Sequence, residues 1–131
     1  MKVLVDTCVW SEALRKKDGH SKVIDQLSSL IEDDRVVLVG PVRQEILSGI
    51  KDEKVFNRIE MQLDHFPDLV LRKSDYVFAA RCSNRCRAQG IQGSAVDFLL
   101  MAVALNYECS IFTVDGDFKR FQAAIPELRL Y

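Results

Sequence analysis

The chain has 131 residues, which is the length of a single domain and enough to enclose one hydrophobic core. Hydrophobic residues make up 48% of it, which excludes a disordered polar tail. Its 18 Lys and Arg residues against 19 Asp and Glu residues give a formal charge of −1. That balance excludes a strongly basic, histone-like nucleic-acid binder and leaves room only for a local basic patch. We therefore expect one domain over residues 1–131.

The chain begins with a short apolar run followed by two helical patterns. Residues 2–5 predict a buried strand, and a helix is expected over 9–17, ending at the turn Asp18-Gly19. Ser21 is a suitable N-cap for a second helix, whose apolar residues recur at helical spacing over 23–31.

The rest of the chain continues this alternation. Apolar or β-branched runs predict further strands at 36–39, 69–71, 110–114 and 128–130. Four further helices are expected: from Gly40-Pro41 to Gly49, over 55–66 before Pro67, from Ser74 to Gly90, and after Ser94. The helix after Ser94 is apolar on all sides from 98 to 105. Strands separated by helices form right-handed crossovers. We therefore expect an α/β fold with a central parallel sheet of about four to five short strands and helices on both faces.

The cysteines and the apolar runs indicate in which cellular compartment the protein is expected. The four cysteines could form disulfides, but a chain of this length and apolar content does not need them. A zinc site is disfavoured because neither histidine stands at ligand spacing from a cysteine. The longest apolar run, 98–105, is too short to span a membrane, and Asp6 interrupts the first apolar run, unlike a secretory signal. We expect free thiols and a cytoplasmic protein.

Acidic residues follow two of the predicted strands. Asp6 comes after the first strand, and Asp115 and Asp117 come after the strand at 110–114. Glu45 lies in the helix after the second strand, and Asp97 lies in the first turn of the apolar helix. Ligands bind outside the carboxyl ends of parallel strands, so neighbouring strands would bring these carboxylates together. Two such charges about 4 Å apart repel by about 4 kcal/mol at an effective dielectric constant of 20. Either protons or a hard divalent cation, Mg²⁺ or Mn²⁺, would have to neutralise them.

Each acidic residue also has an ordinary structural interpretation. Ser94 and Asp97 stand at the spacing of a capping box, so Asp97 could simply satisfy backbone N–H groups. Asp115-Gly116-Asp117 is a common turn composition, and Glu45 could be a solvated helix position. No single carboxylate decides between these interpretations.

Four segments of the chain, taken together, resemble the signature regions of PIN-domain ribonucleases. They are Val3-Leu4-Val5-Asp6-Thr7, Pro41-Val42-Arg43-Gln44-Glu45-Ile46, the stretch from Gly90 through Asp97 to Ala102, and Thr113-Val114-Asp115-Gly116-Asp117-Phe118. Their order and spacing are most similar to those of the VapC-like toxins of toxin–antitoxin pairs. The resemblance covers nearly the whole chain and implies the PIN-like three-layer sandwich.

The resemblance also implies a function and a set of site residues. An endonuclease that uses Mg²⁺ or Mn²⁺ to cut single-stranded or looped RNA is expected, as a homodimer inhibited by a cognate antitoxin. The acidic metal-binding and catalytic residues would be Asp6, Glu45, Asp97 and Asp115, with Asp117, Thr113 and Thr7 in support. Relatives often carry Asn or Ser where this chain has Cys8, which puts a ligand role for that position in doubt.

RNA binding requires positive charge, and the chain concentrates it between Arg72 and Arg87. Five basic residues and one acidic residue give this segment a charge of +4, and Arg81 and Arg85 share a helix face at i, i+4. This face is either an RNA contact or a solvated surface, or it meets an acidic partner. Trp10 and Phe118 flank acidic positions and either stack an unpaired base or belong to the core.

Other classes of α/β protein fit the sequence less well. A receiver domain would need an adjacent acidic pair after the first strand, and an aspartyl phosphatase would need Asp-x-Asp there, where Cys8 stands. A nucleotide cofactor is not expected because the first turn is not glycine-rich. The main alternative is a catalytically inactive PIN-like module that binds protein or RNA, against which the intact acidic quartet argues.

Overall fold

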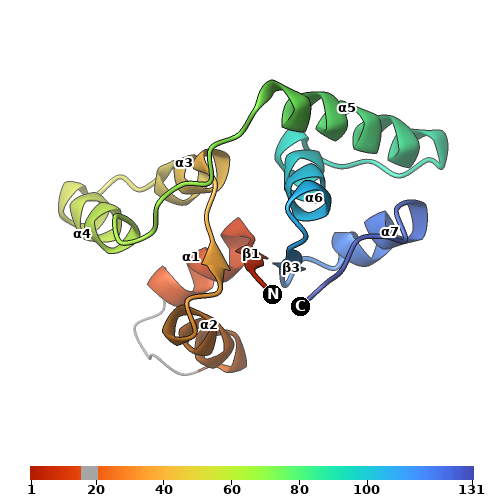
Figure 1. Ribbon diagram of the computed structural model, residues 1–131. Coiled ribbons are helices and arrows are strands. Elements are labelled where there is room, and N and C mark those ends of the chain that lie inside the picture. Colours follow the sequence, from red (N-terminus) through yellow and green to blue (C-terminus); the bar gives the residue numbers. More distant parts are fainter. Residues whose placement is uncertain (16–20) are drawn as a thin grey trace.

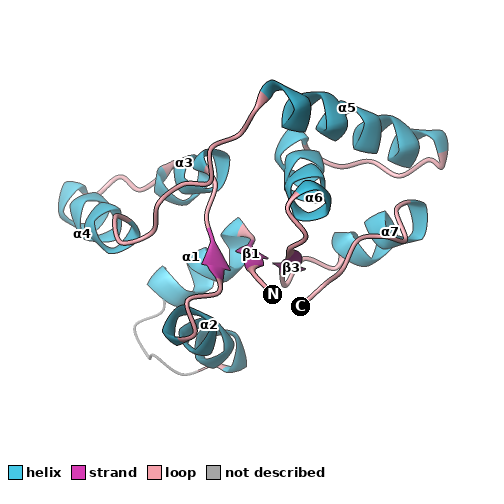
Figure 2. Cartoon of the chain, viewed as in Figure 1, coloured by secondary structure: helices cyan, strands magenta, loops and turns pink. Residues whose placement is uncertain are grey.

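The computed structural model describes residues 1–15 and 21–131, so the predicted turn Asp18-Gly19 lies outside the described residues (Figure 1). A parallel sheet of three strands lies at the centre: β1 (Val3–Val5), β2 (Val36–Val37) and β3 (Ser110–Phe112) (Figure 2). Their order is β2-β1-β3, and Leu4 in the middle strand is in register with Val37 on one side and Ile111 on the other. The fully buried β1 therefore ends between its two neighbours, at the carboxyl edge of the sheet.

Helices account for most of the chain and lie on both sides of these strands. They are α1 (Thr7–Arg15), α2 (Lys22–Glu32), α3 (Gly40–Leu47), α4 (Glu53–Leu63), α5 (Lys73–Ala88), α6 (Ala95–Asn106) and α7 (Asp117–Ala124). Figure 1 shows α1 to α4 on one side of the strands and α5 to α7 on the other. The expected α/β architecture with helices on both faces is confirmed.

Two of the expected strands are reduced to single bridges at the edges of the sheet. Asp68 bridges Leu38 beside β2, and Leu130 bridges Ile111 beside β3. The first of these segments follows Pro67 and leaves Val70 77% exposed, so it touches the sheet at one point and turns away. The sheet thus has three paired strands, with the two bridging segments extending it at either side.

Local capping signals placed several helix ends correctly, but α1 begins at Thr7 instead of 9, α4 covers Glu53–Leu63 instead of 55–66, and α7 was not predicted. Ser21 and Ser94 cap α2 and α6, and Gly49 and Gly90 take positive φ just after α3 and α5. Ser74, however, does not cap α5, which begins at Lys73.

The cap of α5 is the buried carboxylate of Asp75, which accepts the Arg72 N–H at 2.9 Å. Although burial opposes its ionisation, this bond and those from Asn106 and Tyr107 hold the pKa of Asp75 below its usual range. The two side chains that complete the cap lie at the end of α6, so tertiary contact decides where α5 begins.

The core is continuous, and α6 passes through it. Seven consecutive residues of α6, from Phe98 to Ala104, are buried, as the apolar pattern predicts. All four cysteines are free, which confirms the expectation of unpaired thiols. Among the residues that the structure describes, none of the helices has the length and apolar composition that a membrane crossing needs.

Candidate active site

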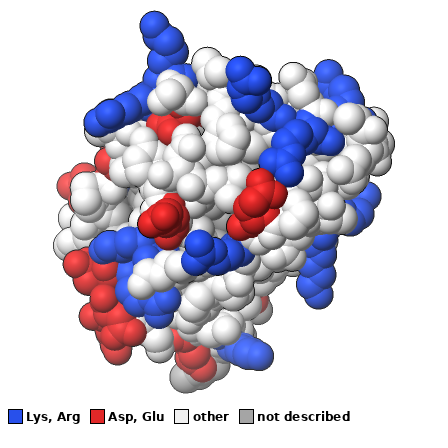
Figure 3. Space-filling model, turned by 45° about the vertical axis from the view of Figure 1, so that its right-hand side comes forward, with Lys and Arg blue, Asp and Glu red and all other residues white. Residues whose placement is uncertain are grey.

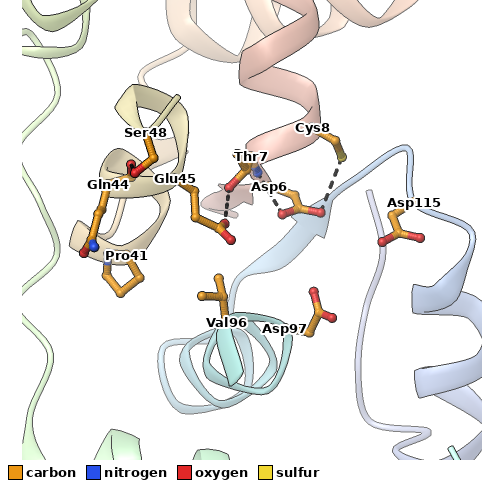
Figure 4. A pocket seen from close by; sticks show the side chains of 10 residues that line it. All are labelled: Asp6, Thr7, Cys8, Pro41, Gln44, Glu45, Ser48, Val96, Asp97 and Asp115. Atoms are coloured by element: carbon orange, nitrogen blue, oxygen red, sulfur yellow. Dashed lines mark hydrogen bonds between the residues drawn. The ribbon is translucent and has the colours of Figure 1, made fainter. Parts of the chain in front are cut away.

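A cleft of about 630 Å³ opens at the carboxyl edge of the sheet, where β1 and β3 end (Figure 4). Four carboxylates line it, and each comes from a different segment: Asp6 after β1, Glu45 on α3, Asp97 in the first turn of α6, and Asp115 after β3. The predicted acidic quartet is therefore brought together in one cleft, because β1 and β3 are neighbours and α3 and α6 begin beside them.

Asp6 is the most buried of the four, with 7% of its surface exposed. One carboxylate oxygen accepts the Thr7 N–H at 2.8 Å, and the other accepts the Thr113 hydroxyl at 2.8 Å. The Cys8 thiol donates a longer bond of 3.4 Å to that second oxygen. Burial, together with the nearby charge of Asp6, raises the pKa of the Cys8 thiol, so this side chain is a neutral donor to Asp6.

Thr113 connects Asp6 to Asp115. Its hydroxyl oxygen accepts the Asp115 N–H at 3.0 Å while its hydroxyl hydrogen goes to Asp6. The Asp115 carboxylate in turn accepts the N–H of Asp117 at 2.9 Å. The carboxylate of Asp117 pairs with Arg120 at 2.6 Å and does not line the cleft. Asp117 thus acts on the cleft through its backbone, which orients Asp115.

Glu45 is held from across the cleft by Thr7, whose hydroxyl donates to Glu45 Oε1 at 2.6 Å. Pro41, Gln44 and Ser48 line the same wall as Glu45. Pro41, Gln44 and Glu45 on α3 and Ser48 at its C-cap are spaced by three, one and three positions, which is one face of a helix. Gln44 and Ser48 are cleft residues that the sequence analysis did not single out, although helical spacing from Glu45 points to both.

Asp97 both caps the N-terminus of α6 and lies close enough to the other carboxylates of the cleft for their charges to affect its pKa. Its carboxylate accepts the Ser94 N–H at 2.9 Å, and its own N–H donates to the Ser94 hydroxyl at 3.1 Å, which is a complete capping box. Burial is the largest cause of a raised pKa at Asp97, and the charges of Asp6 and Asp115 add to it, while the bonds to Ser94 oppose it. The repulsion expected of converging carboxylates is therefore present at this residue.

The donor set of the cleft suits a hard divalent cation. Its donors are carboxylate and hydroxyl oxygens, which Mg²⁺ and Mn²⁺ prefer, and a cation would relieve the repulsion at Asp97. In the described part of the chain, no three His, Cys, Asp or Glu side chains are arranged to hold an ion by themselves.

The predicted RNA contacts lie apart from the cleft. Arg85 binds Glu127 through both terminal nitrogens, at 2.9 and 3.2 Å, and donates to the Ala124 carbonyl at 3.1 Å. Arg81 is exposed and lines a separate hollow with Lys73 and Phe78. Neither arginine lines the acidic cleft, and their role in RNA binding stays a prediction.

The two aromatic residues considered for base stacking belong to the core. Trp10 is 2% exposed and Phe118 is fully buried. Trp10 meets the edge of Phe66 at 5.2 Å between ring centroids, and Phe118 meets Phe121 at 5.1 Å. Of the two interpretations left open by the sequence, the structure therefore supports the core one.

Comparison with known families and sequences gives matches over most of the chain. The family model described as "PIN domain" matches residues 3–124. "VapC ribonuclease Mb1587" of Mycobacterium bovis and "Ribonuclease VapC11" of Mycobacterium tuberculosis are each 27% identical to this chain over 120 residues, which cover 88% of both chains.

Solved structures resemble the fold over nearly its whole length. A chain of VapBC2 from Rickettsia felis, bound to a DNA fragment from their promoter, superposes with a TM-score of 0.81 at 17% identity, covering 100% of this chain and 98% of that one. A chain of FitAcB from Neisseria gonorrhoeae gives 0.79 at 23% identity, covering 98% and 96%. Because both identities are below 25%, the similarity to these structures shows a shared fold and nothing more.

Proposed function

Because the chain belongs to the PIN domain family, we propose that it is a divalent-metal-dependent endoribonuclease that hydrolyses phosphodiester bonds in RNA. The observation that carries the proposal is the convergence of four carboxylates, from four separate segments, on one cleft at the carboxyl edge of the sheet. Two relatives that match most of the chain are named as ribonucleases, which supports the same reaction class.

In this proposal the four acidic residues of the cleft have two different roles, metal binding and activation of water. Asp6, Asp97 and Asp115 would hold Mg²⁺ or Mn²⁺, and Glu45 would either bind the ion through a water or accept a proton from the attacking water. When bound, the ion supplies positive charge for the phosphoryl oxygens and lowers the pKa of a bound water.

Two threonines keep the carboxylates of the cleft in place. Thr7 positions Glu45, and Thr113 positions Asp6 and Asp115 together. Asp117 supports Asp115 through its N–H.

The names of the relatives and of the similar structures also suggest the biological role of the proposed ribonuclease. We place the chain as the toxin of a toxin–antitoxin pair with a cognate antitoxin protein as its partner, since the relatives reported above are VapC ribonucleases and the similar structures are VapBC and FitAB assemblies. We further propose that it is a cytoplasmic homodimer. The single domain spans residues 1–131. A short reading frame for an antitoxin beside this gene, and co-purification of the two products, would support this setting.

The experiment that tests the reaction uses protein freed of any bound partner. The chain should cut members of an RNA panel in the presence of Mg²⁺ or Mn²⁺ and stop when EDTA is added. Undiminished cleavage in EDTA would contradict metal dependence. Binding of RNA or of a protein without cleavage under any metal would instead favour the inactive binding module.

A further inference from the structure

An apolar groove adjoins the acidic cleft on the side of α5. It has a volume of about 400 Å³ and lies between α5 and the first turns of α6, with Tyr76, Ala80, Ser83 and Leu99 among its walls. The groove and the cleft share two lining residues, Pro41 and Val96. In Figure 4, Val96 stands beside Asp97 at the start of α6, so the groove begins directly next to a catalytic carboxylate.

The groove continues into a smaller polar hollow at its other end. Arg87 and Gln92 line this hollow, and it shares Ser83 and Phe98 with the groove. The cleft, the groove and the hollow therefore follow one another as neighbouring depressions, a path over the N-terminal turns of α6. The path has carboxylates at one end, apolar and aromatic surface in the middle, and a guanidinium and an amide at the far end.

One face of α5 forms a side of this path. Tyr76, Ala80, Ser83 and Arg87 are spaced by four, three and four residues, so they lie in a row along the helix. The row is about 16 Å long at a rise of 1.5 Å per residue, which is longer than a single nucleobase. Tyr76 is 54% exposed, so the helix offers an aromatic side chain for contact near the apolar section.

The arginines of α5 differ in whether they can bind a ligand. The guanidinium of Arg85 is occupied by Glu127 and the Ala124 carbonyl. No described residue pairs with the guanidinium of Arg87, which is exposed at the far end of the path. Arg81 is also exposed, but it lines the hollow with Lys73 and Phe78, which shares no residue with the groove.

The charge over this part of the surface favours an anionic ligand. α5 is the uppermost element in Figure 1, and on the face shown in Figure 3 Lys and Arg side chains gather along the upper and right-hand edges. Acidic side chains lie nearer the middle of the same face, and one of them adjoins a basic side chain of the right-hand group (Figure 3). An extended ligand that is negatively charged and carries flat apolar groups would match both the basic edge and the uncharged surface.

We infer that this groove binds the unpaired nucleotides that flank the scissile phosphate, an inference that rests on the proposed ribonuclease activity. Unpaired bases stack on aromatic side chains and on apolar surface, and Arg binds backbone phosphates. Tyr76 and the apolar walls receive a base, Arg87 binds a backbone phosphate, and Ser83 and Gln92 present hydrogen-bonding groups to a base edge. A base must leave a duplex before it can stack on Tyr76, so such a groove would favour single-stranded or looped RNA.

The test is equilibrium binding of a labelled single-stranded RNA of about 12 nucleotides, in EDTA so that the probe stays intact. Arg87→Gln should weaken binding and reduce the slope of log Kd against log salt by about 0.7, the value for one phosphate contact on a single strand. Tyr76→Ala should weaken binding about fivefold or more through lost stacking. Arg58→Gln is the matched control, because Arg58 is exposed on α4 and lines neither the cleft, the groove nor the polar hollow, and it should change neither quantity.

The remaining outcomes separate this inference from its alternatives. Equal losses in Arg87→Gln and Arg58→Gln would overturn it, because overall charge would then explain binding. If Tyr76→Ala left RNA affinity unchanged and halved the mass measured by light scattering, the groove would be an interface with a second copy. If the unaltered chain cut RNA and both groove variants bound it normally, the inference would fail while the ribonuclease proposal stood. Failure of the unaltered chain to cut RNA with any metal would overturn the proposed function itself. Melting curves establish that each variant is folded.

Discussion

Replacing Asp6 by asparagine distinguishes a metal-binding carboxylate from one that only holds the fold together. Asparagine has nearly the same shape, and its oxygen can still accept the Thr7 N–H that Asp6 accepts at 2.8 Å. The Thr113 hydroxyl, which now donates at 2.8 Å, can rotate and accept from the new amide. The substitution therefore removes one negative charge from the cleft and leaves its contacts largely in place.

Two effects on the metal-free protein oppose each other. Hydrogen bonds to a charged group contribute about 1.5–3 kcal/mol and neutral ones about 0.5–1.5 kcal/mol, so weakening the two short bonds of Asp6 costs about 2 kcal/mol. In the other direction, Asp6 is 7% exposed and its charge adds to the raised pKa of Asp97, so removing that charge relieves both burial and repulsion. We expect the free energy of unfolding without metal to change by less than about 2 kcal/mol.

The response to Mg²⁺ is the decisive quantity. A ligand at ten times its dissociation constant stabilises a protein by about 1.4 kcal/mol. At about 2.1 cal/mol/K per residue, a chain of 131 residues has an unfolding entropy near 0.28 kcal/mol/K, so this stabilisation raises the Tm by about 5 °C. We expect that rise in the parent chain, little or none in Asp6→Asn, and loss of RNA cleavage in the variant.

The assay is a melting curve with and without Mg²⁺ at constant ionic strength, paired with RNA cleavage. Asp64→Asn is the matched control, because Asp64 is exposed at the end of α4 and does not line the cleft. It should keep the Mg²⁺ response and the activity of the parent. A full Mg²⁺ shift in Asp6→Asn, together with a lower Tm in the absence of metal, would refute the assignment of Asp6 as a metal ligand.

Three further predictions address other parts of the structure. Thr7→Val removes the 2.6 Å bond to Glu45 and should lower the cleavage rate about tenfold with little change in Tm; an unchanged rate would contradict a positioning role. Asp97 has a raised pKa in the folded protein, so its ionisation destabilises the fold as pH rises from its ordinary value through the raised one. The Tm of Asp97→Asn minus the Tm of the parent, both measured without metal, should therefore increase between about pH 4 and pH 7. A difference that stays constant over this range would contradict the raised pKa of Asp97. Gly93→Ala would place a Cβ 2.8 Å from the Phe121 ring, which should destabilise the chain by about 1–3 kcal/mol in thermal unfolding, and an unchanged Tm would show that the ring yields freely.

Charge counting along the chain could not identify which basic residues are free to bind RNA. The sequence shows five basic residues between Arg72 and Arg87, but it does not show that Glu127, 42 residues after Arg85, occupies that guanidinium. Nor does it show that Arg87 lies in a row with Tyr76 toward the groove, because that depends on which face of α5 packs on α6. Ion pairs between distant segments exist only once the chain is folded.

The sequence by itself determined the features that depend on neighbouring residues. Alternating apolar runs predicted the α/β fold, Ser94 and Asp97 predicted the capping box, and a carboxylate directly after a strand predicted Asp6 and Asp115 at the edge of the sheet. These signals are local, since a strand, a cap or a turn is specified within a few residues.

Only the tertiary structure decided how those residues meet. The order β2-β1-β3 makes β1 and β3 neighbours, and it brings Thr113 to Asp6 across 107 positions of sequence. Packing likewise reduced two expected strands to bridges, and α5 begins at Lys73, with the buried Asp75 in place of Ser74 as its cap. Strand pairing and burial depend on contacts between segments far apart in the chain, so the folded arrangement, rather than any local pattern, makes one cleft out of four separate carboxylates.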